Sequence, residues 1–141
     1  MATRKEQERI DVARDMPANT RHVFADGKDV WIFRKKTEVN IEFEIAIYYD
    51  SDEGGYCAQL VNPEIEELWK NPHIGHLFND GVICMGWDSQ RTRKTIIESF
   101  AKACFWAEGM GIMIASHLNG TPIEWPFGKD NSPEEAKDAF R

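Results

Sequence analysis

The sequence predicts one α+β domain over residues 1–141, and three observations lead to that expectation. Residues 40–50 alternate between apolar and polar side chains, which is the period of a half-buried β-strand. Residues 92–108 carry apolar side chains at steps of three and four, which is the period of an amphipathic helix. A chain of 141 residues without an internal repeat or an evident linker suits a single hydrophobic core.

The first half of the chain predicts a helix followed by an antiparallel meander of three to four strands. Residues 5–15 are mostly charged and are followed closely by a proline, which is typical of an N-terminal surface helix. Residues 29–36 and 56–61 are rich in β-branched and aromatic side chains and predict two further strands. In the strand at 40–50 one face is apolar and the other acidic, with Ile41, Phe43, Ile45 and Ile47 opposite Glu42 and Glu44.

The second half predicts mainly helices and loops. Residues 62–72 hold two prolines and interrupt the sheet with a short helical turn. Gly109 is a candidate C-cap for the long helix, and residues 110–118 either extend that helix or follow it. A loop with an exposed Trp125 comes next, and Ser132 is the expected N-cap of a last short helix.

Composition excludes several classes of function. The net charge is −7, and no basic stripe interleaved with aromatic residues is present, so we expect no nucleic-acid partner. No segment approaches the roughly 20 apolar residues that a membrane span needs, and the N-terminus lacks the apolar core of a secretory signal. We therefore expect a cytoplasmic protein without a membrane partner.

The three cysteines have different sequence contexts. They show no CxxC spacing, which argues against a disulfide framework. Cys104 falls on the apolar face of the long helix and is expected in the core, and Cys57 lies in a strand with a structural role. Cys84 follows a tight turn and lies between Gly81 and Gly86, so it is either a packed core thiol or an accessible nucleophile.

Two histidines precede this cysteine. His73 and His76 form a weak case for a metal site with Cys84, because no CxxC or HxxxH pair completes a tetrahedral set. We expect no metal and no cofactor. A Cys-His hydrolase is a second interpretation, in which His76 or His117 would act as the base.

Residues 76–87, which read HLFNDGVICMGW, resemble the centre of a ubiquitin-conjugating enzyme, above all its prokaryotic members. The Gly-x-Ile-Cys-apolar pattern, the strands before it and the helix after it carry the resemblance, which extends more loosely over residues 31–108. His76 precedes Cys84 by eight residues, at the place of the family's asparagine. The family's Pro-Pro pair is missing, and Gly86 replaces a common acidic residue.

The resemblance implies a ubiquitin-conjugating-like fold with a shortened C-terminus, and a role for each nearby residue. Cys84 would carry a protein C-terminus as a thioester and pass it to a lysine amine. His76 would donate a hydrogen bond to the oxyanion or act as a base, or would only support the turn. His73 would be scaffold, and Asp88 would orient the lysine or cap the helix. Trp87 and Trp125 would line a peptide groove or pack in the core.

The resemblance also implies partners. The donor of the C-terminus would be a ubiquitin-like protein or a cyclic-nucleotide synthase, because similar stand-alone proteins accompany such partners in bacterial conjugation and antiphage signalling operons. A separate activating enzyme is a further expected partner, since no phosphate-binding loop is present. The alternative from another class is a non-catalytic binding module with the same fold.

Overall fold

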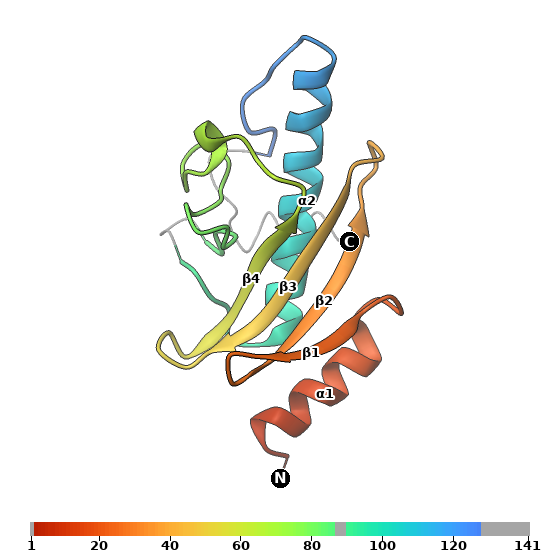
Figure 1. Cartoon of the computed structure of the whole chain (residues 1–141), viewed down its shortest axis with the longest axis vertical. Helices are drawn as coiled ribbons and strands as arrows, with labels where there is room; N and C mark the ends of the chain where they lie inside the picture. The colour runs from red at the N-terminus through yellow and green to blue at the C-terminus, as the bar shows by residue number, and fades with distance from the viewer. Residues whose placement is uncertain (1, 87–89, 128–141) are drawn as a thin grey trace.

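A computed structural model describes residues 2–86 and 90–127. Within these residues the chain forms an N-terminal helix, a four-stranded antiparallel sheet and a long second helix, which confirms the α+β class (Figure 1). The elements are α1 (Arg4–Asp15), β1 (Arg21–Ala25), β2 (Lys28–Lys36), β3 (Glu42–Asp50), β4 (Gly55–Asn62), the 3-10 turn η1 (Glu67–Trp69) and α2 (Ile96–Leu118). The strands follow one another in the order β1-β2-β3-β4, so each pairs with its neighbour in sequence.

Strand β1 was not among the segments with a strong strand pattern. Strands β1 and β2 are joined by a two-residue loop, Asp26-Gly27. Both loop residues have positive φ angles, of 51° and 75°. Asp-Gly is the sequence signature of this tight hairpin turn, because both central positions need a left-handed backbone. The Asp-Gly turn, and not the residues of β1 themselves, is therefore the local sequence signal for this strand.

The core lies between the sheet and α2, which crosses one face of the sheet in Figure 1. The predicted alternation in β3 is confirmed, because Phe43, Ile45 and Ile47 are fully buried on this face. Trp106 of α2 packs edge-on against Phe43 with ring centroids 5.3 Å apart. Each such buried side chain stabilises the fold by roughly 1.5–3 kcal/mol.

Helix α2 differs from its predicted bounds at both ends. Thr95 caps its N-terminus, since its hydroxyl accepts the Glu98 N–H at 3.1 Å. The expected C-cap at Gly109 is wrong, and the alternative that residues 110–118 extend the helix is confirmed: α2 continues to Leu118, and Gly120, with a φ of 76°, follows the end. Gly109 is instead buried against the ring of Trp125. The predicted helix at Ser132 lies outside the described residues.

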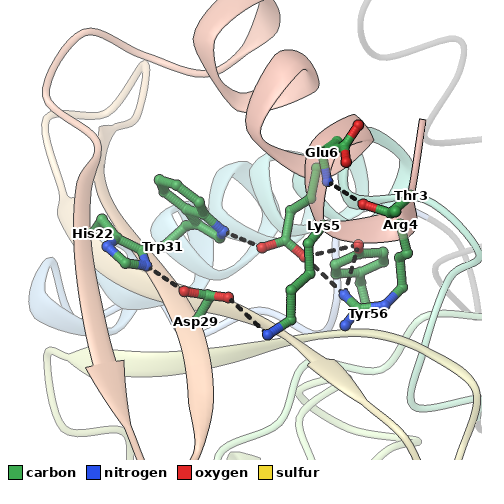
Figure 2. Close-up of polar contacts among 9 residues, drawn as sticks. Thr3, Arg4, Lys5, Glu6, His22, Asp29, Trp31 and Tyr56 are labelled. Atoms are coloured by element: carbon green, nitrogen blue, oxygen red, sulfur yellow. Dashed lines mark hydrogen bonds and ion pairs between the residues drawn. The ribbon is translucent and has the colours of Figure 1, made fainter.

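Helix α1 contacts the sheet through a cluster of polar groups, and its Val12 packs against the core. The Glu8 carboxylate, only 3% exposed, accepts hydrogen bonds from Arg4 at 3.0 Å, Tyr56 at 2.9 Å and the Trp31 indole at 2.7 Å. Figure 2 shows the Trp31 and Tyr56 side chains reaching from the sheet toward this helix. Because Trp31 and Phe33 alternate onto one face of β2, α1 and α2 cover the same face of the sheet.

A second polar cluster supports the same contact. The His22 ring lies 2.7 Å from Asp29, whose other oxygen lies 3.8 Å from the Lys5 ammonium (Figure 2). The hydrogen bond with His22 and the charge of Lys5 lower the pKa of Asp29. Neither helix in the ranges 2–86 and 90–127 combines the length and apolar character that a membrane span requires.

Candidate functional site

The candidate site is built on a short hairpin that follows β4 and η1. Residues 77–83 fold back on themselves around the Asn-Asp-Gly turn, and Leu77 pairs with Ile83. Phe78 donates its N–H to the Val82 carbonyl at 2.7 Å. Gly81 has a φ of 89°, a conformation that favours glycine, so the turn depends on this residue.

The hairpin brings His76 and Cys84 together. Cys84 donates its backbone N–H to the His76 carbonyl at 3.0 Å, so the two residues lie side by side where the hairpin opens. His76 has a φ of 51°, which histidine adopts more readily than most residues other than glycine. The eight-residue spacing in the sequence is thus the spacing of two opposed hairpin positions.

The hairpin is fixed to the free edge of β4. Leu60 of β4 donates to the Gly81 carbonyl and Ile83 donates to the Ala58 carbonyl, both at 2.8 Å. Arg93, just before α2, exchanges two backbone hydrogen bonds with the start of the same strand. The chain around Cys84 therefore runs along the sheet edge and leads into α2.

The His76 and Cys84 side chains are both buried. Cys84 is 2% exposed and His76 is 1% exposed. The Cys84 thiol donates a hydrogen bond to the Gly86 carbonyl at 3.2 Å. In this conformation the site is closed to a large reactant.

Trp125 covers the His76 ring. The two rings are tilted by 52° with centroids 4.6 Å apart. Trp125 is not fully exposed: its side chain is partly buried and packs against the core, and it also lines a groove. It fits there because Gly109 has no side chain: a Cβ would lie 2.6 Å from the Trp125 Cζ2 atom.

A groove of about 940 Å³ opens beside this cover. His73 lies in its wall together with Trp69, Ile123 and Trp125. The exposed His73 donates its backbone N–H to the Asn71 side chain at 2.8 Å, so its backbone stabilises the local turn. His73 therefore borders the groove, whereas His76 lies under the cover.

The other candidate residues from the sequence are Trp87, Asp88 and His117. Trp87 and Asp88 lie outside the described residues. His117 is half-exposed in the last turn of α2, where it lies 3.3 Å from Glu66 and packs edge-on against Trp69. Its imidazole thus faces η1.

Two contributors to the site escaped the sequence prediction. The Trp106 indole donates a hydrogen bond to the Gly75 carbonyl at 2.9 Å, which fixes the backbone just before His76. Gly75 itself lies so close to the Trp69 carbonyl that a Cβ would collide with it. A glycine directly before a candidate catalytic histidine was the available signal for this close approach.

The other two cysteines are confirmed as buried. Burial raises the pKa of Cys104 to about 12. Burial, together with the nearby Asp50 carboxylate, raises the pKa of Cys57 to about 11. Both thiols therefore stay protonated at neutral pH and are poor nucleophiles.

Across residues 2–86 and 90–127, no cluster of three or more histidine, cysteine or acidic side chains is arranged to hold a metal ion. Comparison of the chain with family models, with curated proteins and with solved structures finds no significant match.

Proposed function

We propose that this chain is an acyltransferase of the ubiquitin-conjugating type. Cys84 carries the C-terminus of a protein as a thioester and transfers it to a lysine amine of a target. The observation that carries the proposal is the hairpin that pairs His76 with Cys84 at the edge of the sheet, directly ahead of α2. The order of helix, antiparallel meander, cysteine segment and helix agrees with that fold.

The proposed chemistry has two steps. In the first, the Cys84 thiolate attacks the carbonyl carbon of an activated C-terminus, and the activating group leaves as the thioester forms. In the second, an amine attacks the thioester carbon, an oxyanion develops, and the Cys84 thiolate leaves. The amine loses a proton to a base, so the products are an amide and the free enzyme.

His76 is the group best placed to act in the second step. Its backbone carbonyl accepts the Cys84 N–H, so the two residues are neighbours across the hairpin. An imidazole N–H that donates to the oxyanion stabilises the transition state, and loss of one such donor typically slows the reaction by ~10²–10³-fold. Neutral imidazole also accepts a proton from the amine near neutral pH.

The proposal requires that the site open. With Cys84 only 2% exposed, a peptide carboxyl end reaches its sulfur only after neighbouring side chains move. The groove bordered by Trp69 and Trp125 is the nearest large opening to the His76 cover. We place the activity in the bacterial cytoplasm, in antiphage defence, with a ubiquitin-like protein or a cyclic-nucleotide synthase as donor and an activating enzyme as a further partner.

The test is a loading assay with the proteins encoded beside this chain in its genome, in the presence of ATP. We expect a covalent adduct that a thiol reductant releases. Cys84→Ser should form an ester that resists the reductant, and Cys84→Ala should form no adduct. If Cys84→Ala still forms every adduct, the proposal is wrong.

Two further variants separate catalysis from packing. Cys104→Ala removes a buried thiol outside the hairpin and should leave loading intact. His76→Ala should load normally but discharge to an amine more slowly by about 10²-fold. An unchanged discharge rate in the folded His76→Ala protein would assign this residue to the scaffold.

A non-catalytic binding module with the same fold is the second candidate, and the burial of both Cys84 and His76 favours it. In that case the thiol only packs and donates to the Gly86 carbonyl. A module would bind the same partner proteins without an adduct, and Cys84→Ala would bind them as tightly as the wild type. The loading assay run beside a binding assay distinguishes the two.

A further inference from the structure

The segment that follows α2 is named here the strap and comprises residues 121–127. It turns back along α2 toward the chain that follows β4, as the blue end of the ribbon in Figure 1 shows. The Trp125 ring lies between His76 and Gly109, and so joins the candidate site to the helix. Phe127 packs on Phe105 of α2, with ring centroids 5.0 Å apart.

The strap is held by ring packing and few polar contacts. Residues 122–127 make no backbone–backbone hydrogen bond to any other part of the chain that the structure describes. The first strap residue, Thr121, is tied to α2 by its N–H, which donates to the Ser116 carbonyl at 2.9 Å. The strap is thus anchored at the helix end, rests on His76 through Trp125 and packs on α2 through Phe127.

The closed position of the strap carries a free-energy cost. The Trp125 indole N–H is buried and has no hydrogen-bond partner among the described residues. A buried donor without a partner typically costs about 1–3 kcal/mol, and water would satisfy it if the ring moved out. This cost opposes the gain from burying the ring and brings the closed and open positions closer in free energy.

Open space lies next to the strap. The groove of about 940 Å³ is lined by the strap residues Pro122, Ile123 and Trp125 together with Leu68 and Trp69 from the chain that follows β4. Ile123 is 44% exposed and Leu68 is 67% exposed. The strap therefore borders free volume on this flank rather than a packed core, and it can shift without displacing another element.

We propose that the strap is a removable cover of the candidate site and that Trp125 is the residue that closes it. When Trp125 rests on His76, the imidazole is sealed from reactants. When the ring swings toward the groove, His76 becomes accessible and the indole N–H gains water. The inference that this cover regulates transfer rests on the proposed function. The inference that it controls the accessibility of His76 does not depend on that function.

The test measures how fast diethylpyrocarbonate modifies each histidine of the full chain, with peptide mapping by mass spectrometry. In the wild type His76 should react far more slowly than the exposed His22 and His117. Trp125→Ala should raise the rate at His76 about tenfold or more and leave the rates at His22 and His117 unchanged. Trp125→Phe keeps an aromatic ring but removes the unsatisfied N–H, so His76 should stay protected.

Trp69→Ala is the matched control, because Trp69 also lines the groove and its ring packs edge-on against His117. It should leave His76 protected. The far-UV circular dichroism of every variant shows whether the fold is retained. If His76 in folded Trp125→Ala reacts no faster than in the wild type, or if Trp69→Ala exposes it equally, the strap is not its cover.

This result and the loading assay separate the two proposals. Faster modification of His76 without any adduct on Cys84 would support the cover and reject the transferase. A reductant-sensitive adduct combined with an unchanged rate at His76 would support the transferase and reject the cover. When both hold, Trp125→Ala should also discharge its thioester faster than the wild type.

Discussion

At the scale of single residues, Asp80 fixes the hairpin of the candidate site. One carboxylate oxygen accepts the Val82 N–H at 3.2 Å, and the other accepts a hydrogen bond from Arg91 at 2.5 Å. The Arg91 guanidinium also lies over the Phe78 ring, 4.7 Å from its centroid. Partial burial opposes ionisation of Asp80, but the bonds from Arg91 and Val82 outweigh it and lower the pKa of the carboxyl.

We therefore expect Asp80→Asn to lower the free energy of unfolding at pH 7 by about 0.5–1 kcal/mol, a small value because the ion pair is partly exposed and screened by solvent. Chemical denaturation at a series of pH values measures the difference. Asp52→Asn, in the exposed turn after β3, is the control and should change stability by less than about 0.5 kcal/mol.

The pH dependence of that difference follows from the sign of the pKa shift. The folded pKa of Asp80 lies below its unfolded value of about 3.9, so its contribution is complete above that pH. The contribution is lost as the pH falls through the folded pKa. Wild type and Asp80→Asn should thus converge in stability as the pH falls below the folded pKa of Asp80, and a difference that stays constant throughout the acid range would contradict this account.

At the scale of elements, Gly109 ties α2 to the strap. In an ordinary helix interior, Gly→Ala stabilises by roughly 0.5–1 kcal/mol, because the glycine backbone loses more freedom on folding. Here the added Cβ would lie 2.6 Å from one ring carbon of Trp125 and 2.9 Å from another. The indole would have to move away from the helix, and with it from His76.

We expect Gly109→Ala to give no gain in thermal stability and to raise the reactivity of His76 toward diethylpyrocarbonate. A double-mutant cycle supplies the control, because in a Trp125→Ala background the collision is absent. In that background Gly109→Ala should stabilise by about 0.5–1 kcal/mol. Equal effects of Gly109→Ala in both backgrounds would show that the indole and the helix are not coupled.

The same elements show what could be predicted from the sequence. The strand at β3 and the buried face of α2 follow from local periodicity, and both are present. The meeting of His76 and Cys84 follows from a turn signal between them. Gly109 was misread because a glycine at the end of a periodic stretch normally ends a helix, whereas this one makes room for a ring 16 residues later in the chain. The contact of Trp125 with His76 joins residues 49 positions apart, which no local pattern encodes.

At the scale of the whole molecule, two kinds of contact hold the layers together. Helix α2 and the sheet share an apolar core that includes Phe43, Ile47 and Trp106. Helix α1 buries one charged residue, Glu8, whose carboxylate gathers donors from its own helix and from two strands. The first kind of contact is apolar and extensive, whereas the second depends on a few directional bonds.

Because local opening costs least where few apolar contacts are lost, the two helices should differ in amide hydrogen exchange. We expect α1 to exchange well before α2 and β3, which should persist until the molecule unfolds globally. Glu8→Ala leaves the buried Tyr56 hydroxyl and the partly buried Trp31 indole without this acceptor and removes the partner of Arg4, so it should accelerate exchange in α1. In this variant the amide exchange rates of β3 and α2 should keep the same order as in the wild type.

Glu6→Ala, on the exposed side of α1, is the matched control and should leave the exchange rates of all elements unchanged. Equal protection of α1 and β3, with no response to Glu8→Ala, would mean that α1 belongs to the cooperative core and that its polar contacts do not govern its attachment.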